Sequence, residues 1–213
     1  MGNSNSPTKI HLQRDPVFAP LVQSLRLEPL DTSSDVYFRL LRAIVFQQLS
    51  GKAASTIFGR FQSLFPEGYP DPERLLKLTV PDLRLVGLSN QKAQYVQNVA
   101  TYFLEKDLVR QDWSRLPDEE IQEQLVAIKG VGEWTVQMIL IFSLGRKDIL
   151  PLGDLAIRQS IQQLYQLQGT SRELHQQMLK VAEKWRPYRS VASRYLWTWK
   201  DAQAVGQKGG ANT

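Results

Sequence analysis

The chain has 213 residues, of which 42% are hydrophobic and 22% charged, and its net charge is +5. This balance suits one large or two small folded domains and excludes a disordered chain. The absence of cysteine excludes a disulfide scaffold, cysteine-ligated zinc, an iron–sulfur cluster and a thiol nucleophile. Two distant histidines, His11 and His175, leave no dense histidine-based metal cluster.

Neither a secretory leader nor a membrane span is expected. Residues 1–9 are small and polar, without the apolar stretch of a signal peptide. The longest apolar run, Met138–Leu144, is far shorter than the ~20 residues that cross a bilayer. We therefore expect a soluble intracellular protein that binds no membrane, with flexible tails at residues 1–11 and 202–213.

Amphipathic helices account for nearly the whole chain between these tails. Apolar residues recur at helical spacing, and Pro, Gly, Ser and Asp mark where segments begin and end. Alternating β-branched strands with hairpin turns are missing, so we expect an all-α fold. The expected helices begin at Asp15–Pro16 (towards Leu25), Ser34–Asp35 (through Leu49), Gly51 (through Phe65), Pro72, Pro81 (to Gly87), Ala93 (through Leu104), Pro117 (through Ile128) and Leu155 (through Leu167).

The most informative local pattern is a pair of glycines between two apolar helices, at about residues 121–143. The string reads Ile128-Lys129-Gly130-Val131-Gly132, and an apolar helix follows at once. Glycine permits positive φ and close approach to another molecule, and a tight turn at a helix start aims free N–H groups outward, which can bind a phosphate. The alternative is a short helix–helix turn with a glycine C-cap. The whole string resembles the helix-hairpin-helix DNA-binding motif.

A carboxylate follows the hairpin, 22 residues after Gly132. Pro151 and Gly153 mark a loop, and Asp154 stands at the entrance of the next helix. Asp is among the best N-cap residues, so a purely structural role is one interpretation. A helix N-terminus also stabilises an ionised carboxylate, which is what a developing cation needs beside it.

Hairpin, helix, Pro/Gly loop and Asp together resemble the helix-hairpin-helix–Gly/Pro–Asp superfamily of DNA base-excision glycosylases. Three further strings resemble its alkylation-repair branch, the 3-methyladenine DNA glycosylase II family. The correspondence runs from about Leu21 to Trp199, with the motifs in the right order. The strings are Phe46-Gln47-Gln48-Leu49-Ser50-Gly-Lys-Ala-Ala, Gly87-Leu88-Ser89-x-x-Lys92-Ala93-x-x-Val96 and Trp185-Arg186-Pro187-Tyr188-Arg189-Ser190-x-Ala192.

This resemblance implies an activity and its catalyst. Asp154 would stabilise the oxocarbenium-like sugar as the N-glycosidic bond of an alkylated purine breaks, and would orient or activate the attacking water. Bifunctional members carry a lysine nucleophile two positions after the second hairpin glycine, where this chain has Trp134. A monofunctional enzyme that leaves an intact abasic site in duplex DNA is therefore expected, with no cofactor and no iron–sulfur cluster. The resemblance admits a structural Na⁺ or K⁺ at the carbonyls of Ile128 and Val131.

Basic and aromatic side chains alternate near the C-terminus. Residues 184–200 hold five basic residues, five aromatics and no acidic residue, a pattern expected for a surface that meets phosphates and stacks on bases. An amphipathic helix with core aromatics is the alternative. Aromatic rings also attract the cationic bases that alkylation creates. The candidate base-pocket residues are Trp134, Trp185, Tyr188 and Trp197, and the candidate DNA-backbone contacts are Lys129, Gly130, Val131, Gly132, Arg158 and Arg189.

The resemblance places a wedge in the Gln-rich turn, where a side chain enters the duplex when a base is extruded. Gln48 is the first candidate and Gln47 the second, although helix-end glutamines that face water are an equal alternative. A polar residue at this place departs from the bulky apolar wedge that could stand there.

The implied fold is a two-lobed helical one, in its compact form without an N-terminal β domain. One lobe is expected to combine residues 12–34 with 149–201, and the other to comprise 35–148. We expect a monomer, in the cytoplasm near the nucleoid if the source is bacterial and in the nucleus if it is eukaryotic. Two alternatives stay open: a glycosylase for oxidised or deaminated bases, and a non-catalytic helix-hairpin-helix module that binds DNA.

Overall fold

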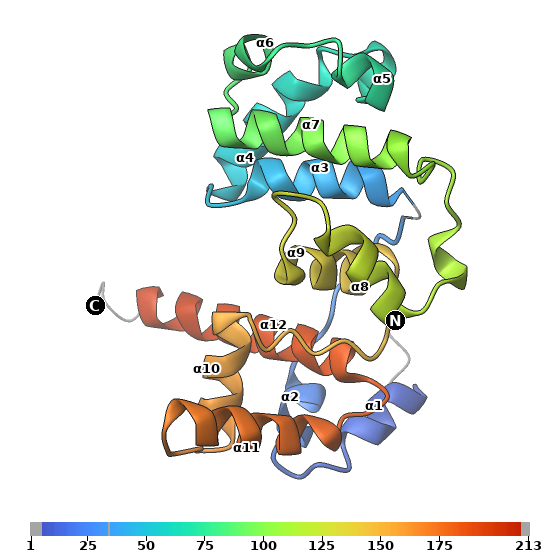
Figure 1. Ribbon diagram of the computed structural model, residues 1–213. Helices are drawn as coiled ribbons and strands as arrows, with labels where there is room; N and C mark the ends of the chain where they lie inside the picture. The colour runs from blue at the N-terminus through green and yellow to red at the C-terminus, as the bar shows by residue number, and fades with distance from the viewer. Residues whose placement is uncertain (1–5, 34, 210–213) are drawn as a thin grey trace. The chain divides into compact units, whose positions relative to one another are not determined.

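The computed structural model describes residues 6–33 and 35–209, with side chains through Ala204 (Figure 1). These residues form helices and turns and no strand, which confirms the all-α prediction. No helix within the described ranges is long and apolar enough to cross a membrane. Ser34, expected to share the cap of a helix with Asp35, and the outermost residues of both predicted tails lie outside the described residues.

The chain divides into two compact units, Asp31–Gly145 and a second one that combines Met1–Leu30 with Arg146–Thr213. The sequence predicted the two boundaries between the lobes at 34/35 and 148/149. The helices of the Asp31–Gly145 unit are α3 (Val36–Phe46), α4 (Gly51–Gln62), η1 (Pro66–Gly68), α5 (Pro72–Leu75), α6 (Val80–Leu85), α7 (Asn90–Glu105), η2 (Trp113–Arg115), α8 (Asp118–Val126), α9 (Glu133–Met138) and η3 (Ile139–Ser143). Those of the other unit are α1 (Pro7–Leu12), α2 (Ala19–Ser24), α10 (Leu155–Leu164), α11 (Ser171–Glu183) and α12 (Arg189–Gly209).

In the Asp31–Gly145 unit, the packed pair α3 and α7 forms the centre (Figure 1). Asp35 caps α3 as predicted, because its carboxylate accepts the Phe38 N–H at 2.8 Å. Four residues of the apolar stripe that the sequence predicted on α7 are buried, namely Ala93, Val96, Ala100 and Phe103. The fifth, Leu104, is 37% exposed.

Helix α3 ends at Phe46, earlier than the predicted end at Leu49. The reason lies in the backbone, since Gln48 has a φ of +56° and therefore cannot continue a right-handed helix. Leu49 consequently leaves the apolar stripe and is 39% exposed.

The hairpin between α8 and α9 depends on one glycine with a left-handed backbone. Gly130 has a φ of +106°, and a Cβ built on it would lie 2.3 Å from Cγ of Tyr95 on α7. The Asn98 side chain of the same helix donates to the Lys129 carbonyl at 3.0 Å. Helix α7 therefore supports the hairpin turn through Tyr95 and Asn98. Gly132 differs, because its φ is −94° and nothing lies within 4 Å of a Cβ built there.

The other unit has one core to which both ends of the chain contribute. Phe18, from the turn before α2, packs on Trp185 with ring centroids 5.1 Å apart and meets Tyr195 of α12 edge-on at 6.2 Å. Pro7–His11, expected to belong to a flexible tail, form most of α1, and α12 continues through residues expected in the other tail. The helix predicted from Asp15 begins only at Ala19. The residues before it form a turn in which the Asp15 carboxylate accepts the Val17 N–H and the Tyr165 hydroxyl.

The two hairpin glycines should respond differently to the same added methyl group. We expect Gly130→Ala to lower the free energy of unfolding by about 2 kcal/mol or more, because it combines a strained φ with a steric clash against Tyr95. Gly132→Ala should lower it by less than about 1 kcal/mol, the cost of a poorer N-cap. Denaturant unfolding of the two variants measures both values. Equal losses would contradict this difference in environment.

Candidate functional site

Asp154 begins helix α10 and is held by that helix. Its backbone is extended, and its Oδ1 accepts the Ile157 N–H at 3.0 Å, as an N-cap side chain does. Before it, the Asp154 N–H donates to the Pro151 carbonyl at 3.0 Å, so the predicted Pro/Gly loop is a tight turn. The carboxylate is half-buried at the N-terminal end of the helix.

A tryptophan from α12 reaches the same carboxylate. The Nε1 of Trp197 donates to Asp154 Oδ1 at 3.3 Å. Trp197 is half-buried, so its indole lies beside the carboxylate without being sealed in the core. The sequence indicated both residues for separate reasons, and the structure brings them together.

The turn before Asp154 is organised by Arg158, one helical turn further along α10. Its Nη1 donates to the carbonyls of Leu152 at 3.0 Å and Gly153 at 3.1 Å. The sequence predicted that Arg158 contacts the DNA backbone, whereas here its guanidinium holds the loop that presents Asp154. Leu155, which no sequence pattern had indicated, is 59% exposed directly beside Asp154.

Of the other aromatic candidates in this unit, Trp185 is a core residue. It is fully buried and packs against Phe18 and Tyr165. We therefore correct its assignment to the base pocket, since a ring without exposed surface cannot stack on a base. Tyr188 is half-buried, and its ring meets that of His11 at 5.4 Å, which leaves it a candidate.

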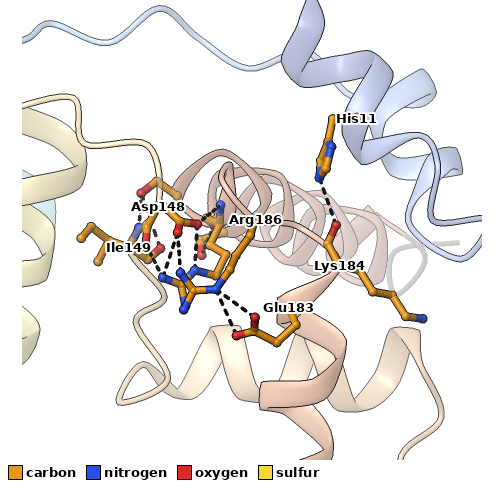
Figure 2. A network of polar contacts seen from close by, with 9 residues as sticks. His11, Asp148, Ile149, Glu183, Lys184 and Arg186 are labelled. Atoms are coloured by element: carbon orange, nitrogen blue, oxygen red, sulfur yellow. Dashed lines mark hydrogen bonds and ion pairs between the residues drawn. The ribbon is translucent and has the colours of Figure 1, made fainter.

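Arg189 is engaged within the protein, and its contact with the DNA backbone stays a prediction. Its Nε donates to Asp148 Oδ1 at 2.8 Å and its Nη2 to the Asp148 carbonyl oxygen at 2.7 Å. Asp148 Oδ2 also accepts a hydrogen bond from Arg186 Nη1 at 2.9 Å, and Arg186 Nε donates to Glu183 Oε2 at 2.9 Å (Figure 2). Much of the basic charge predicted near the C-terminus is therefore neutralised by acidic residues that lie outside residues 184–200.

In the Asp31–Gly145 unit, the hairpin exposes Lys129 and Gly132. The Val131 N–H, by contrast, donates to the Ile128 carbonyl at 3.0 Å, and the Val131 side chain is buried. The Val131 amide therefore already has a partner within the hairpin, and a contact of Val131 with the DNA backbone stays a prediction. The Ile128 carbonyl keeps a second lone pair, and the monovalent cation at the Ile128 and Val131 carbonyls stays a prediction. Trp134, on α9, is 46% exposed.

The turn after α3 carries the two wedge candidates. Gln48 is exposed and holds a left-handed backbone, which costs a non-glycine residue about 1 kcal/mol or more. Gln47 is half-buried, and its carbonyl accepts the Nζ of Lys92 at 2.7 Å. The same ammonium donates to the Val45 carbonyl at 2.8 Å. Sequence reasoning missed this role of Lys92, because a backbone carbonyl leaves no signal in the sequence.

Residues 6–33 and 35–209 contain no group of three or more His, Asp or Glu side chains that could hold a metal ion. What the structure presents at Asp154 is a single oriented carboxylate with an indole beside it.

Comparisons with known proteins agree with this arrangement. The chain is 37% identical to a DNA-3-methyladenine glycosylase of Schizosaccharomyces pombe over 76% of its own length and 71% of that protein's. It is 35% identical to a putative DNA-3-methyladenine glycosylase of Bacillus subtilis, over 79% of its own length and 60% of that protein's.

Solved structures show the same fold. A DNA-3-methyladenine glycosidase of Bacillus halodurans superposes with a TM-score of 0.81 at 32% identity, covering 94% of this chain and 92% of that one. The S. pombe 3-methyladenine DNA glycosylase in complex with abasic DNA gives 0.76 at 35% identity, covering 90% and 95%.

The family assignment rests on most of the chain. Residues 41–187 match one family, and this range contains the Gln-rich turn, the hairpin and the loop that ends in Asp154. The relatives confirm the resemblance to the alkylation-repair branch that the motifs indicated. The chain belongs to the HhH-GPD superfamily of base excision DNA repair proteins.

Proposed function

We propose that the protein is a monofunctional DNA glycosylase that hydrolyses the N-glycosidic bond of alkylated purines in duplex DNA and leaves an abasic site. The observation that carries this proposal is the Asp154 carboxylate, held at the start of α10 by the Ile157 N–H and the Trp197 Nε1. The names of the relatives, DNA-3-methyladenine glycosylases, support the substrate class, and the abasic-DNA complex of one of them supports the product.

Asp154 acts on the sugar in this proposal. As the bond to the damaged base breaks, positive charge develops on the sugar ring, and a fixed negative group beside it lowers the barrier. Two donors to Oδ1 fix the plane of the carboxylate, so little reorganisation accompanies the reaction. The group also orients the attacking water. An alkylated purine is already a good leaving group, so one carboxylate suffices without a second acid.

The residue two positions after Gly132 argues for hydrolysis alone. A lysine there would attack the sugar and form a Schiff base that leads to strand cleavage. Trp134 has no nucleophilic amine and is 46% exposed, so it can offer a ring face rather than a nucleophile. We therefore expect no lyase step.

Aromatic faces favour the damaged base over the normal one. Methylation at a purine ring nitrogen makes the base cationic, and a cation over an aromatic ring gains about 0.5–2 kcal/mol. The accessible aromatic candidates are Trp134, Tyr188 and Trp197, since Trp185 is buried. Extrusion also costs less for a damaged pair, which adds to the preference.

The DNA-binding contribution is assigned to the hairpin. Gly132 has open space around it and Lys129 is exposed, so both can approach a phosphate. Contacts of this kind position the protein without reading the lesion.

Replacing Asp154 by Asn should abolish base release while the fold and DNA binding persist. Asn is as good an N-cap as Asp, so α10 keeps its first turn, but the neutral amide cannot stabilise the cationic sugar. We expect at least about a hundredfold loss in the rate of base release, the order of magnitude for one preorganised electrostatic group. Single-turnover release from methylated DNA measures it.

A matched control for this variant lies on the same helix. Gln159 of α10 is exposed, and Gln159→Ala should leave release unchanged because it alters α10 while the Asp154 carboxylate stays in place. Release by Asp154→Asn at the wild-type rate would sink the assignment of Asp154.

Substituting Gly132 by Val should weaken binding to damaged and undamaged duplex by the same factor, about tenfold, because a branched side chain keeps a phosphate away from the turn. Fluorescence anisotropy with both duplexes measures the two dissociation constants, and thermal unfolding controls for folding. Wild-type affinity of a folded Gly132→Val for undamaged duplex would show that the hairpin does not bind the DNA backbone.

A further inference from the structure

Lys92 of α7 bonds to the end of another helix. Its ammonium donates to the carbonyls of Val45 at 2.8 Å and Gln47 at 2.7 Å, at the C-terminal end of α3. The last carbonyls of a helix have no partner within that helix and carry its negative end. A cation at this place satisfies two of them at once, through charge-assisted hydrogen bonds.

This position is unfavourable for a lysine in other respects. Ser89 caps α7 and accepts the Lys92 N–H, so Lys92 lies in the first turn of α7, where the helix dipole disfavours a cation. Burial also lowers the pKa of the Lys92 ammonium. The contacts with α3 offset both effects, and the α3 end is consequently tied to α7.

The bonds of Lys92 end at the residue before the wedge candidate. Gln48 is exposed, and its φ of +56° sets where its side chain points. The backbone bond across this turn is long, since the Leu49 N–H reaches the Phe46 carbonyl at 3.4 Å. The shorter Lys92 bond to the Gln47 carbonyl fixes the peptide that joins Gln47 to Gln48, and the bond to the Val45 carbonyl holds the ammonium on α3.

We infer that Lys92 is a positioning residue, whose ammonium fixes the Gln47 carbonyl so that the Gln48 side chain is aimed to fill the space that an extruded base leaves in the duplex. The inference rests on the proposed function. If Lys92 only stabilised the fold, its loss would lower the fraction of folded protein and would weaken binding to every DNA by the same factor. A positioning residue changes the affinity only where the duplex has a gap to fill.

The test compares two probes, an undamaged duplex and the same duplex with a tetrahydrofuran abasic analogue, and takes the ratio of their dissociation constants for the full chain. Lys92→Met removes the ammonium at similar side-chain size, and Gln48→Gly removes the wedge while suiting the positive φ. Each should reduce the preference for the abasic duplex about tenfold. The double variant should lose no more than either single one, because both act through the same side chain.

Two further variants separate charge loss from position. Lys106→Met, at the exposed far end of α7, makes the same chemical change and should leave the preference at its wild-type value. Lys92→Arg keeps a cationic donor and should recover most of the preference. If Lys92→Met does not fold, Lys92→Gln, which keeps an N–H donor, is measured in its place and should show a partial loss.

Three results would overturn the inference: an unchanged preference in folded Lys92→Met or Lys92→Gln, losses that multiply in the double variant, or a wild-type chain that binds both probes equally. Failure of the proposed function is distinguishable, because it appears as absence of base release from methylated DNA by the wild-type chain. If the wild-type chain releases base and the Lys92 variants keep the wild-type preference for the abasic duplex, the positioning role is refuted and the proposed function stands.

Discussion

The carboxylate of Asp154 is fixed by the first turn of the helix that follows it, and the surrounding packing serves that geometry. The Ile157 N–H donates to Asp154 Oδ1, and Arg158 donates to two carbonyls of the loop that precedes Asp154. Trp197 completes the arrangement from α12. Helix α12 is in turn positioned by Tyr195 in the core and by Asp148, which accepts the Arg189 N–H at the helix start. Asp154 is the cap of α10, and in the proposed function the same carboxylate is also the catalyst.

In the Asp31–Gly145 unit, an N-terminal helix end and a C-terminal helix end both have a role. The hairpin offers the N-terminal end of α9 through Gly132, while the C-terminal end of α3 is satisfied internally by Lys92. Helix α7 supports both, since Tyr95 and Asn98 lie against the hairpin and Lys92 against α3. One rigid helix thus holds two turns that carry different DNA-binding tasks in the proposed function. Gly130 is required at this junction because only a residue without a Cβ leaves room for the Tyr95 ring.

Local patterns predicted much of this, and long-range partners decided the rest. The Pro/Gly loop and Asp154, the Asp35 cap and the stripe of α7 depend on neighbours a few residues away, so the sequence alone indicates them. Trp185 and Arg189 sit in one basic and aromatic stretch, but Phe18 buries the first and Asp148 pairs with the second. Those partners come from distant segments whose docking no local pattern encodes. The early end of α3 was equally hidden, because a polar residue at positive φ has no distinctive signature.

The most direct measurement is product analysis after incubation of the wild-type chain with methylated duplex DNA. Chromatography identifies the free bases, and denaturing electrophoresis before and after alkali reports on the strand. We expect free methylated purine together with a strand that breaks only after alkali, as an abasic site does. Release of oxidised or deaminated bases alone, or no release at all, would contradict the proposed alkylpurine glycosylase; strand cleavage without alkali would contradict the absence of a lyase step.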